Sequence, residues 1–153
     1  DYHSEFEKEK IIVPAISNKA NNTMDYGVHY SNDKTTIIVH EDSKYLLGIL
    51  NSKLSDFFIK SIASTKRGGY FEYKPMYLAK IPILYEEENH AKIVEAVDSI
   101  FMVKEEYEKL YSQTDKKMLE KTISALENKI DQIVYEIYEL TDEEIKIVQD
   151  STK

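Results

Sequence analysis

The sequence predicts an α+β protein, with a small, twisted, mainly antiparallel sheet and a packed helix, followed by an antiparallel helical hairpin and a short C-terminal helix. Short β-branched runs and the prolines and glycines lie before residue 83, whereas long stretches with helical periodicity follow residue 89. Charge divides at about the same place. Residues 1–82 hold 11 Lys and Arg against 10 Asp and Glu, and residues 83–153 hold 9 against 18. We therefore expect a first domain over residues 1–88 and a helical region over residues 89–153.

Two strands are expected before the first helix. KIIVPAIS, Lys10 to Ser17, is short and β-branched, and Pro14 lacks an N–H donor, which predicts an edge strand or a bulge. TTIIVHE, Thr35 to Glu41, has a continuous apolar run, which predicts a strand that is buried on both faces.

A helix is predicted over about Lys44 to Ala63, because its apolar residues recur at steps of three and four. The stripe that would face the core consists of Leu47, Leu50, Leu54, Phe58 and Ile62. Gly48 lies inside this helix, where glycine is unfavourable, so we expect it to permit a close backbone approach. After the helix, YFEYKP alternates, with Phe71 and Tyr73 on one side of a strand.

The second half predicts two long helices and a short third one. The second helix keeps heptad spacing, through Leu119, Ile123, Leu126, Ile130, Ile133, Ile137 and Leu140. The turn between the two long helices, Ser112 to Asp115, contains capping residues, and a turn this short requires antiparallel packing. TDEE, Thr141 to Glu144, fits a capping box at the start of the last helix.

The composition excludes several classes of function. The chain has 153 residues, 42% of them hydrophobic, which suits one soluble, cytoplasmic unit with a core; the missing initial Met suggests a piece of a longer protein. The absence of cysteines excludes disulfides, thiolate metal sites and cysteine nucleophiles. The histidines are scattered and no phosphate-loop or serine-elbow motif occurs, so neither a metal site nor an active site is expected.

The segment STKRGGYFEYK, Ser64 to Lys74, is the strongest candidate for a binding site in a chain of net charge −8. Two glycines let the backbone approach a ligand closely, and Lys66 and Arg67 supply charge for phosphates. Arg67 can also bind a guanine edge, and Tyr70 and Tyr73 are near enough to stack. Taken alone, an ordinary solvated turn explains this segment somewhat better than a nucleic-acid contact.

A second candidate is ISNKANN, Ile16 to Asn22. Asparagine side chains read adenine edges well, but they also build ordinary turns, so both explanations remain open.

The order of several segments adds a family resemblance. IIVPAISNK is followed by HYSND with TTIIV, then by YLLGILNSKLSDFFIKSIASTKRGGYFEYKPMYLAKIPI and finally by IDQIVYEIYELTDEEI. This ordered set, over about Lys10 to Asp150, resembles the TaqI-like C-terminal specificity domain. Such domains are the target recognition domains of type IIG restriction-modification enzymes and related DNA adenine methyltransferases, and they are similar in role to those of type I specificity subunits.

The resemblance implies that this chain reads double-stranded DNA in the major groove, while a methyltransferase domain that precedes it, or a separate subunit, flips and methylates a base. The chain itself would bind no cofactor; S-adenosylmethionine, with Mg²⁺ as a further candidate, would belong to the parent enzyme. The chain has neither the Asn-Pro-Pro-Tyr methyltransferase motif nor a nuclease motif, so it is not expected to catalyse a reaction alone. The residues expected at the DNA are Ser17, Asn18, Lys19, Asn22, Thr65, Lys66, Arg67, Gly68, Gly69, Tyr70, Tyr73 and Lys74.

A different hypothesis is that the helical hairpin is a protein–protein interaction module and the β part only its platform. Exposed tyrosines beside the heptad stripe, at Tyr111, Tyr135 or Tyr138, would favour it. Under the first hypothesis, the hairpin is instead a spacer and docking region.

Overall fold

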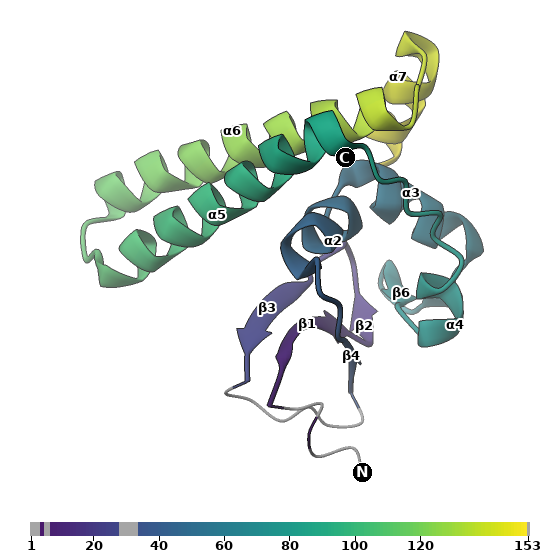
Figure 1. Ribbon diagram of the computed structural model, residues 1–153, viewed down its shortest axis with the longest axis horizontal. Coiled ribbons are helices and arrows are strands. Elements are labelled where there is room, and N and C mark those ends of the chain that lie inside the picture. Colours follow the sequence, from purple (N-terminus) through teal and green to yellow (C-terminus); the bar gives the residue numbers. More distant parts are fainter. Residues whose placement is uncertain (1–3, 5–6, 28–33, 153) are drawn as a thin grey trace.

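The computed structural model describes residue 4, residues 7–27 and residues 34–152, and it has the predicted α+β fold (Figure 1). The strands are β1 (Glu9–Pro14), β2 (Ile16–Ser17), β3 (Thr23–Tyr26), β4 (Thr35–Ile38), β5 (Thr65–Lys66) and β6 (Tyr70–Glu72). The helices are α2 (Ser43–Leu50), α3 (Lys53–Ile62), α4 (Pro75–Leu78), α5 (Glu87–Lys109), α6 (Gln113–Ile137) and α7 (Asp142–Ser151). The segment HYSND and two of the histidines, His3 and His29, lie outside the described residues.

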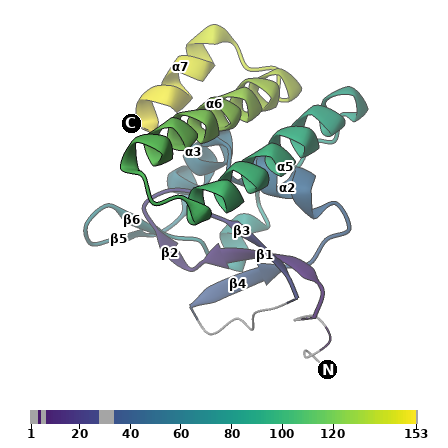
Figure 2. The same ribbon diagram turned by 90° about the vertical axis from the view of Figure 1, so that its left-hand side faces the viewer.

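The strands form two small antiparallel sheets, which we call sheet A and sheet B. Sheet A has the order β3-β1-β4, and sheet B has the order β2-β6-β5. Figure 2 shows the two sheets at different places below the helices, with β2 following β1 directly in the chain. Ala15 alone therefore separates a strand of sheet A from a strand of sheet B.

The prediction of an edge strand or bulge at Lys10 to Ser17 is wrong for Lys10 to Pro14, whereas Ile16–Ser17 does form an edge strand, in sheet B. β1 is the central strand of sheet A, and the chain then continues as β2 in sheet B. Pro14 is tolerated because it stands at the end of β1, opposite Thr35 of β4, whereas the pairing with β3 has already ended at Ile12. Pro14 thus has a strand partner on one side only. Its missing N–H therefore costs no hydrogen bond to β3, as at the edge of a sheet.

The prediction that Thr35 to Glu41 is buried on both faces is also wrong. β4 is an edge strand of sheet A and ends at Ile38, and all four of its residues are half-buried. An apolar run alone does not distinguish a central strand from an edge strand whose two faces are partly covered.

The helix predicted over Lys44 to Ala63 is divided into α2 and α3. Ser52 starts the second helix, because its hydroxyl accepts a hydrogen bond from the Ser55 amide (3.2 Å) and donates one to the Ile49 carbonyl (2.6 Å). The Asp131 carboxylate of α6 accepts from the Lys53 amide at 2.9 Å, so α6 also satisfies the new helix start. As a result Leu47 and Leu50 are buried, whereas Leu54, Phe58 and Ile62 on α3 are only half-buried.

Gly48 has the role that the sequence predicts. A Cβ atom at this position would lie 2.5 Å from Ile93 Cγ2 and 3.3 Å from Val97 Cγ2, both on α5. The missing side chain lets α2 pack closely on α5. Ile11 and Val13 of β1 belong to the same buried cluster as these α5 residues, so the core crosses residue 88, and the two-domain division stays a prediction.

The helical hairpin is confirmed. α5 and α6 lie side by side and extend beyond the sheets, and α7 folds back beside α3 (Figures 1 and 2). Ser112 caps α6, and Thr141 with Glu144 forms the predicted capping box of α7, with the Thr141 amide donating to Glu144 Oε2 at 2.8 Å. Within the described residues, these helices lack the combination of length and apolar character that a bilayer span needs.

Candidate nucleic-acid interface

The candidate site is built on the tight hairpin of β5 and β6, with the turn Arg67–Gly69 at its tip. Lys66 pairs with Tyr70 across the hairpin, and both glycines in the turn have positive φ, 85° for Gly68 and 80° for Gly69. Residues with a Cβ atom rarely adopt this conformation, so the two glycines explain how so short a turn closes. β5, the turn and Tyr70 at the start of β6 are exposed, including Lys66 and Arg67, whereas Phe71 is half-buried and Glu72 is buried.

One face of this hairpin carries positive charge, and we call it the outer face of sheet B: Ile16, Lys66, Tyr70, Glu72 and Lys74. Strand register places Lys66 opposite Tyr70 and Ile16 opposite Glu72, and the alternation of a strand brings Lys74 to the same side. Tyr70 and Ile16 are both exposed. The outer face therefore combines two ammonium groups with an exposed phenol and an exposed aliphatic side chain.

The opposite face of sheet B turns toward the protein. Thr65 and Ser17 each pair with Phe71, which is half-buried, and the Lys60 ammonium of α3 lies 5.6 Å from the centre of the Phe71 ring. This is within the range of a cation–π contact. By strand register, Ser17 and Thr65 thus belong to the face opposite the cationic one.

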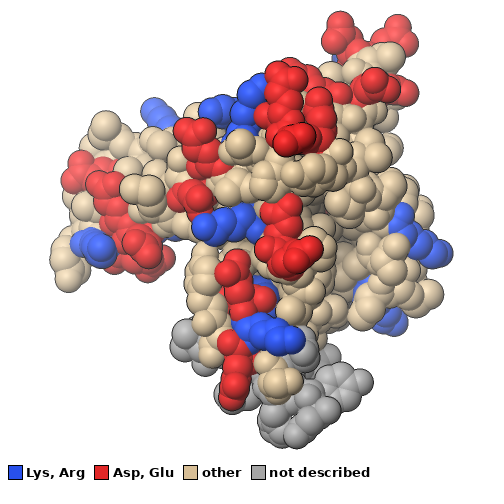
Figure 3. Space-filling view, viewed as in Figure 1, with Lys and Arg blue, Asp and Glu red and all other residues tan. Residues whose placement is uncertain are grey.

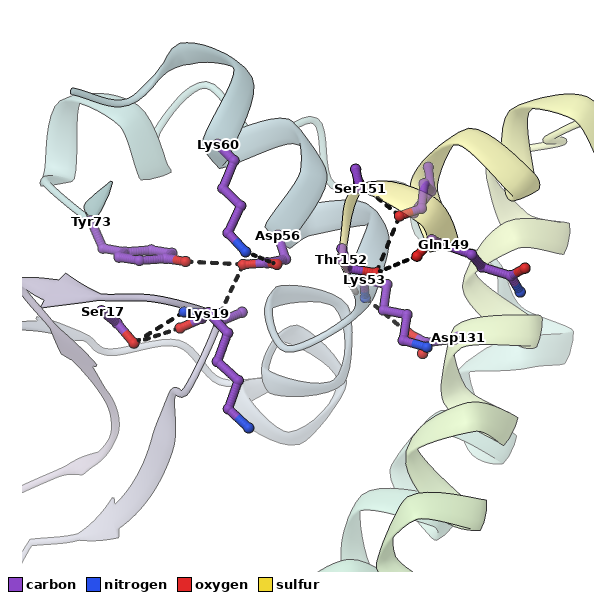
Figure 4. A network of polar contacts seen from close by, with 12 residues as sticks. Ser17, Lys19, Lys53, Asp56, Lys60, Tyr73, Asp131, Gln149, Ser151 and Thr152 are labelled. Carbon is purple, nitrogen blue, oxygen red and sulfur yellow. Dashed lines mark hydrogen bonds and ion pairs between the residues drawn. The ribbon is translucent and has the colours of Figure 1, made fainter. Parts of the chain in front are cut away.

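The SNK segment lies beside sheet B because Asp56 of α3 holds the chain there (Figure 4). Asp56 Oδ1 accepts hydrogen bonds from the Ala20 amide (2.9 Å) and from the Tyr73 hydroxyl (3.0 Å), and Oδ2 pairs with Lys60 (2.8 Å). Ser17 closes a local turn by donating to the Lys19 carbonyl at 2.7 Å. Asn18 and Lys19 are exposed on this turn. One buried carboxylate therefore positions both segments that the sequence singled out.

Two of the expected site residues, Asn22 and Tyr73, are buried. The Asn22 amide donates to Asn51 Oδ1, and Asn51 Nδ2 donates to the Asn22 carbonyl, both at 2.9 Å, which fixes this loop to the junction of α2 and α3. Burial first and the neighbouring Asp56 second raise the pKa of the Tyr73 hydroxyl. The backbone of Asn22 and the side chain of Tyr73 thus hold the fold together from inside, and neither buried side chain belongs to the proposed interface.

Three residues of the site were missed by reasoning from the sequence: Ile16, Asp56 and Glu72. The alternation of YFEYKP does place Glu72 on the side of Tyr70 and Lys74, so a signal for it was present. Ile16 begins the second candidate segment but was not itself expected at the DNA, and Asp56 carried no signal, because the roles of both depend on contacts with segments distant in the chain.

Charge on this side of the molecule is strongly biased. Residues 57–85 contain five Lys and Arg and one acid, Glu72. In Figure 3, blue atoms without red ones lie over the region of β6 and α4, whereas red atoms gather over the hairpin and α7. The acidic average of the chain is thus compatible with a local cationic surface.

A groove of about 600 Å³ adjoins the SNK segment, between residues 19–24, α2 and the hairpin. Its charged lining is mixed: Lys19, Lys53, Lys104, Asp56, Glu127 and Asp131. Among the described residues, no group of three or more His, Asp or Glu is arranged to hold a metal ion. The groove therefore lacks the excess of positive charge that the β5–β6 turn and the outer face of sheet B have, where Lys66, Arg67 and Lys74 stand against Glu72 alone.

Comparison with known families agrees with this geometry. Residues 2–83 match the TaqI-like C-terminal specificity domain, which covers more than half of the chain and includes both sheets and the β5–β6 turn. The chain belongs to this family of specificity domains, and membership supports a role in DNA recognition in restriction-modification enzymes. A search of curated proteins found no match.

Proposed function

We propose that this chain is the non-catalytic target recognition domain of a cytoplasmic restriction-modification enzyme, and that it directs an attached methyltransferase or endonuclease to one DNA sequence. The DNA would lie against the β5–β6 turn, the outer face of sheet B and the adjacent Asn18 and Lys19. The methyltransferase, with its S-adenosylmethionine, would be a preceding domain of the same parent chain or a separate subunit.

The observation that carries this proposal is the exposed turn at Lys66–Tyr70 within a segment that is nearly free of acids. Lys66, Lys74 and Lys19 supply phosphate contacts, which give affinity and salt dependence without sequence information. Arg67 stands at the tip of the turn, where a guanidinium can reach a guanine edge in the major groove and form two parallel hydrogen bonds. Tyr70 offers a ring for apolar or stacking contact.

The test is binding of Lys66→Ala and Arg67→Ala variants to a panel of duplexes that covers the target site of the parent enzyme. Lys66→Ala is expected to weaken binding to all sequences about equally and to reduce the salt slope by about 0.9. Arg67→Ala should also relax the preference at one base pair, where a good contact is worth about 1–3 kcal/mol.

Lys117→Ala is the matched control, because Lys117 is an exposed lysine on α6. It should leave affinity and salt slope nearly unchanged. Equal affinity of Lys66→Ala, Arg67→Ala and the unmodified chain across the whole panel would contradict the proposal.

A second candidate function, protein–protein interaction through the hairpin, is favoured by one observation. Tyr111, in the loop between the two long helices, is 98% exposed, and Met102 and Met118 on the neighbouring helix turns are exposed too. Tyr135, in contrast, is buried, and the Tyr138 hydroxyl donates to the Pro82 carbonyl, so neither is free for a partner. Light scattering of the unmodified chain and of Tyr111→Ser tests this function. A dimer of the unmodified chain that is a monomer in Tyr111→Ser would favour the hairpin as an interface.

A further inference from the structure

Glu72 is the one acid among residues 57–85, and it binds both lysines of the outer face of sheet B. Its Oε1 atom lies 2.7 Å from the Lys66 ammonium, and its Oε2 atom lies 3.0 Å from the Lys74 ammonium. The Glu72 side chain is 11% exposed, whereas those of Lys66 and Lys74 are 46% and 52% exposed. The carboxylate thus lies beneath two cations that remain accessible from solvent.

Strand geometry fixes this arrangement. Lys66 is directly opposite Tyr70, so Glu72 is its diagonal neighbour across the hairpin, within reach of a long side chain. Lys74 follows Glu72 by two residues and lies on the same side. Hydrogen bonds from Lys66 and then from Lys74 lower the pKa of the Glu72 carboxyl, so Glu72 is ionised at neutral pH.

A carboxylate that bridges two ammonium groups resembles, in charge and in the spacing of its oxygens, a DNA phosphate bound by the same two lysines. Both lysines stay about half exposed although the carboxylate is only 11% exposed, so water reaches each pair from the lysine side, and such partly exposed ion pairs contribute little to folding stability. Lysine has three N–H donors on a flexible stem and can exchange one anion for another. These properties suit an exchangeable contact better than a structural one.

We propose that Glu72 restrains the affinity of the interface: it occupies Lys66 and Lys74 in the free protein and competes with DNA phosphate for them. This inference rests on the proposed function. Non-specific binding of DNA is almost entirely electrostatic, and a genome offers a very large excess of wrong sites. An internal anion lowers the affinity for every site and thereby keeps the domain from being retained on DNA that it does not recognise.

The test compares Glu72→Gln with Glu106→Gln, on the target duplex and on a duplex of unrelated sequence. Both substitutions remove one negative charge, and Glu106 is an exposed residue in the last turn of α5. This end of α5 is at the free end of the hairpin, away from β6 (Figure 1). Glu72→Gln should bind both duplexes roughly two- to tenfold more tightly and steepen the salt slope by about 0.9. Glu106→Gln should change little at 0.1 M salt, because charges farther away than about 10 Å are screened.

A double-substitution cycle adds a direct measure of the competition. If Glu72 occupies Lys66, then Lys66→Ala should cost more affinity in the Glu72→Gln background than in the unmodified chain. Equal costs, or weaker binding by Glu72→Gln, would overturn the inference, because the carboxylate would then position the lysines or do nothing to binding.

A measurement on the unmodified chain does not depend on whether a variant folds. The carboxyl of Glu72, followed by NMR with ¹³C-labelled glutamate, should titrate at a higher pH in the DNA complex than in the free protein, because its two lysines leave for phosphate. An unchanged pKa would overturn the inference. If the unmodified chain bound DNA without salt dependence or not at all, the proposed function itself would fail; if it bound and Glu72→Gln behaved like Glu106→Gln, only the role of Glu72 would fail.

Discussion

The two sheets use the same chemistry, a lysine bound to a carboxylate, in opposite environments. In sheet A, Lys10 on β1 is directly opposite Asp25 on β3, and the side chains of this ion pair are 0% and 5% exposed. In sheet B, Glu72 lies below Lys66 and Lys74, which are about half exposed. The first pair is closed off from any ligand, whereas the lysines of the second are open to one.

Burial decides what such a pair can do. Charges that lose their water on folding depend on each other, because either one alone would be left without solvation in a medium of low dielectric constant. Charges at the surface keep much of their water and can change partners at little cost. The difference in burial fits the proposal that sheet A supports the fold while sheet B contacts DNA, and variants in both sheets can test this contrast.

The largest effect is expected in sheet A. Lys10→Met keeps most of the volume of the side chain but removes the Lys10 ammonium from the buried Asp25 carboxylate, which should lower the free energy of unfolding by about 3–5 kcal/mol. Urea denaturation followed by circular dichroism measures this loss. The DNA affinity of the molecules that remain folded should not change.

Lys10→Met with Asp25→Asn is the control for this prediction. Because the second substitution removes the buried negative charge, the double variant should be more stable than Lys10→Met alone. A double variant that is less stable than the single one would show that the two residues act through other contacts, and the contrast between the sheets would then lose its electrostatic basis.

Local signals made the helical half of this fold predictable from its sequence. The heptad spacing before Ile137, the cap at Ser112 and the capping box at Thr141 are each defined within a few residues, and all three are confirmed. The break between α2 and α3 carried a weak local signal too, because serine, here Ser52, is a favoured N-cap residue, but a continuous apolar stripe concealed it.

The β part depends on contacts that neighbouring residues do not reveal. Pro14 could be assigned to a central strand only by knowing that β3 stops pairing at Ile12. The outer face of sheet B could be predicted only in part, since alternation grouped Tyr70, Glu72 and Lys74. The pairing of Glu72 with Lys66 could not, because it depends on the register of the hairpin. Burial of Asn22 and Tyr73 likewise follows from packing against α2 and α3, which residue types alone do not predict.

A smaller effect is expected at the tip of sheet B. Gly69→Ala should cost about 1–2 kcal/mol in the turn, because alanine is strained at φ 80°, while open space around this position excludes a steric clash. Gly69→Asn is the control, because asparagine tolerates positive φ better. Since the turn is exposed, we expect the alanine to displace the turn rather than unfold the protein. DNA affinity should therefore fall clearly, whereas the melting temperature should change little. An equal loss of affinity in both variants would mean that the backbone conformation is not what matters.

The smallest effect is expected on the pH dependence of stability: the ion pairs of Glu72 in sheet B should stabilise the fold less as the pH falls. Hydrogen bonds from Lys66 and Lys74 lower the folded-state pKa of Glu72 below its ordinary value of 4.5, so the unfolded chain takes up this proton first as the pH falls. The pair therefore contributes its full stability above about pH 4.5 and loses it as the pH falls through the folded-state pKa. Asp131 acts in the opposite direction in the same range, because burial raises its pKa and protonation then favours the folded state.

Comparing the unmodified chain with Glu72→Gln over this pH range removes the contribution of Asp131, which both share. The difference in the free energy of unfolding should be small at pH 7 and should vanish in acid, as expected for an exposed pair. A difference as large as that of Lys10→Met would mean that Glu72 holds sheet B together. The lysines would then not be free to exchange it for phosphate. The ion pairs of both sheets would stabilise the fold, and the two sheets would differ only in where these pairs lie.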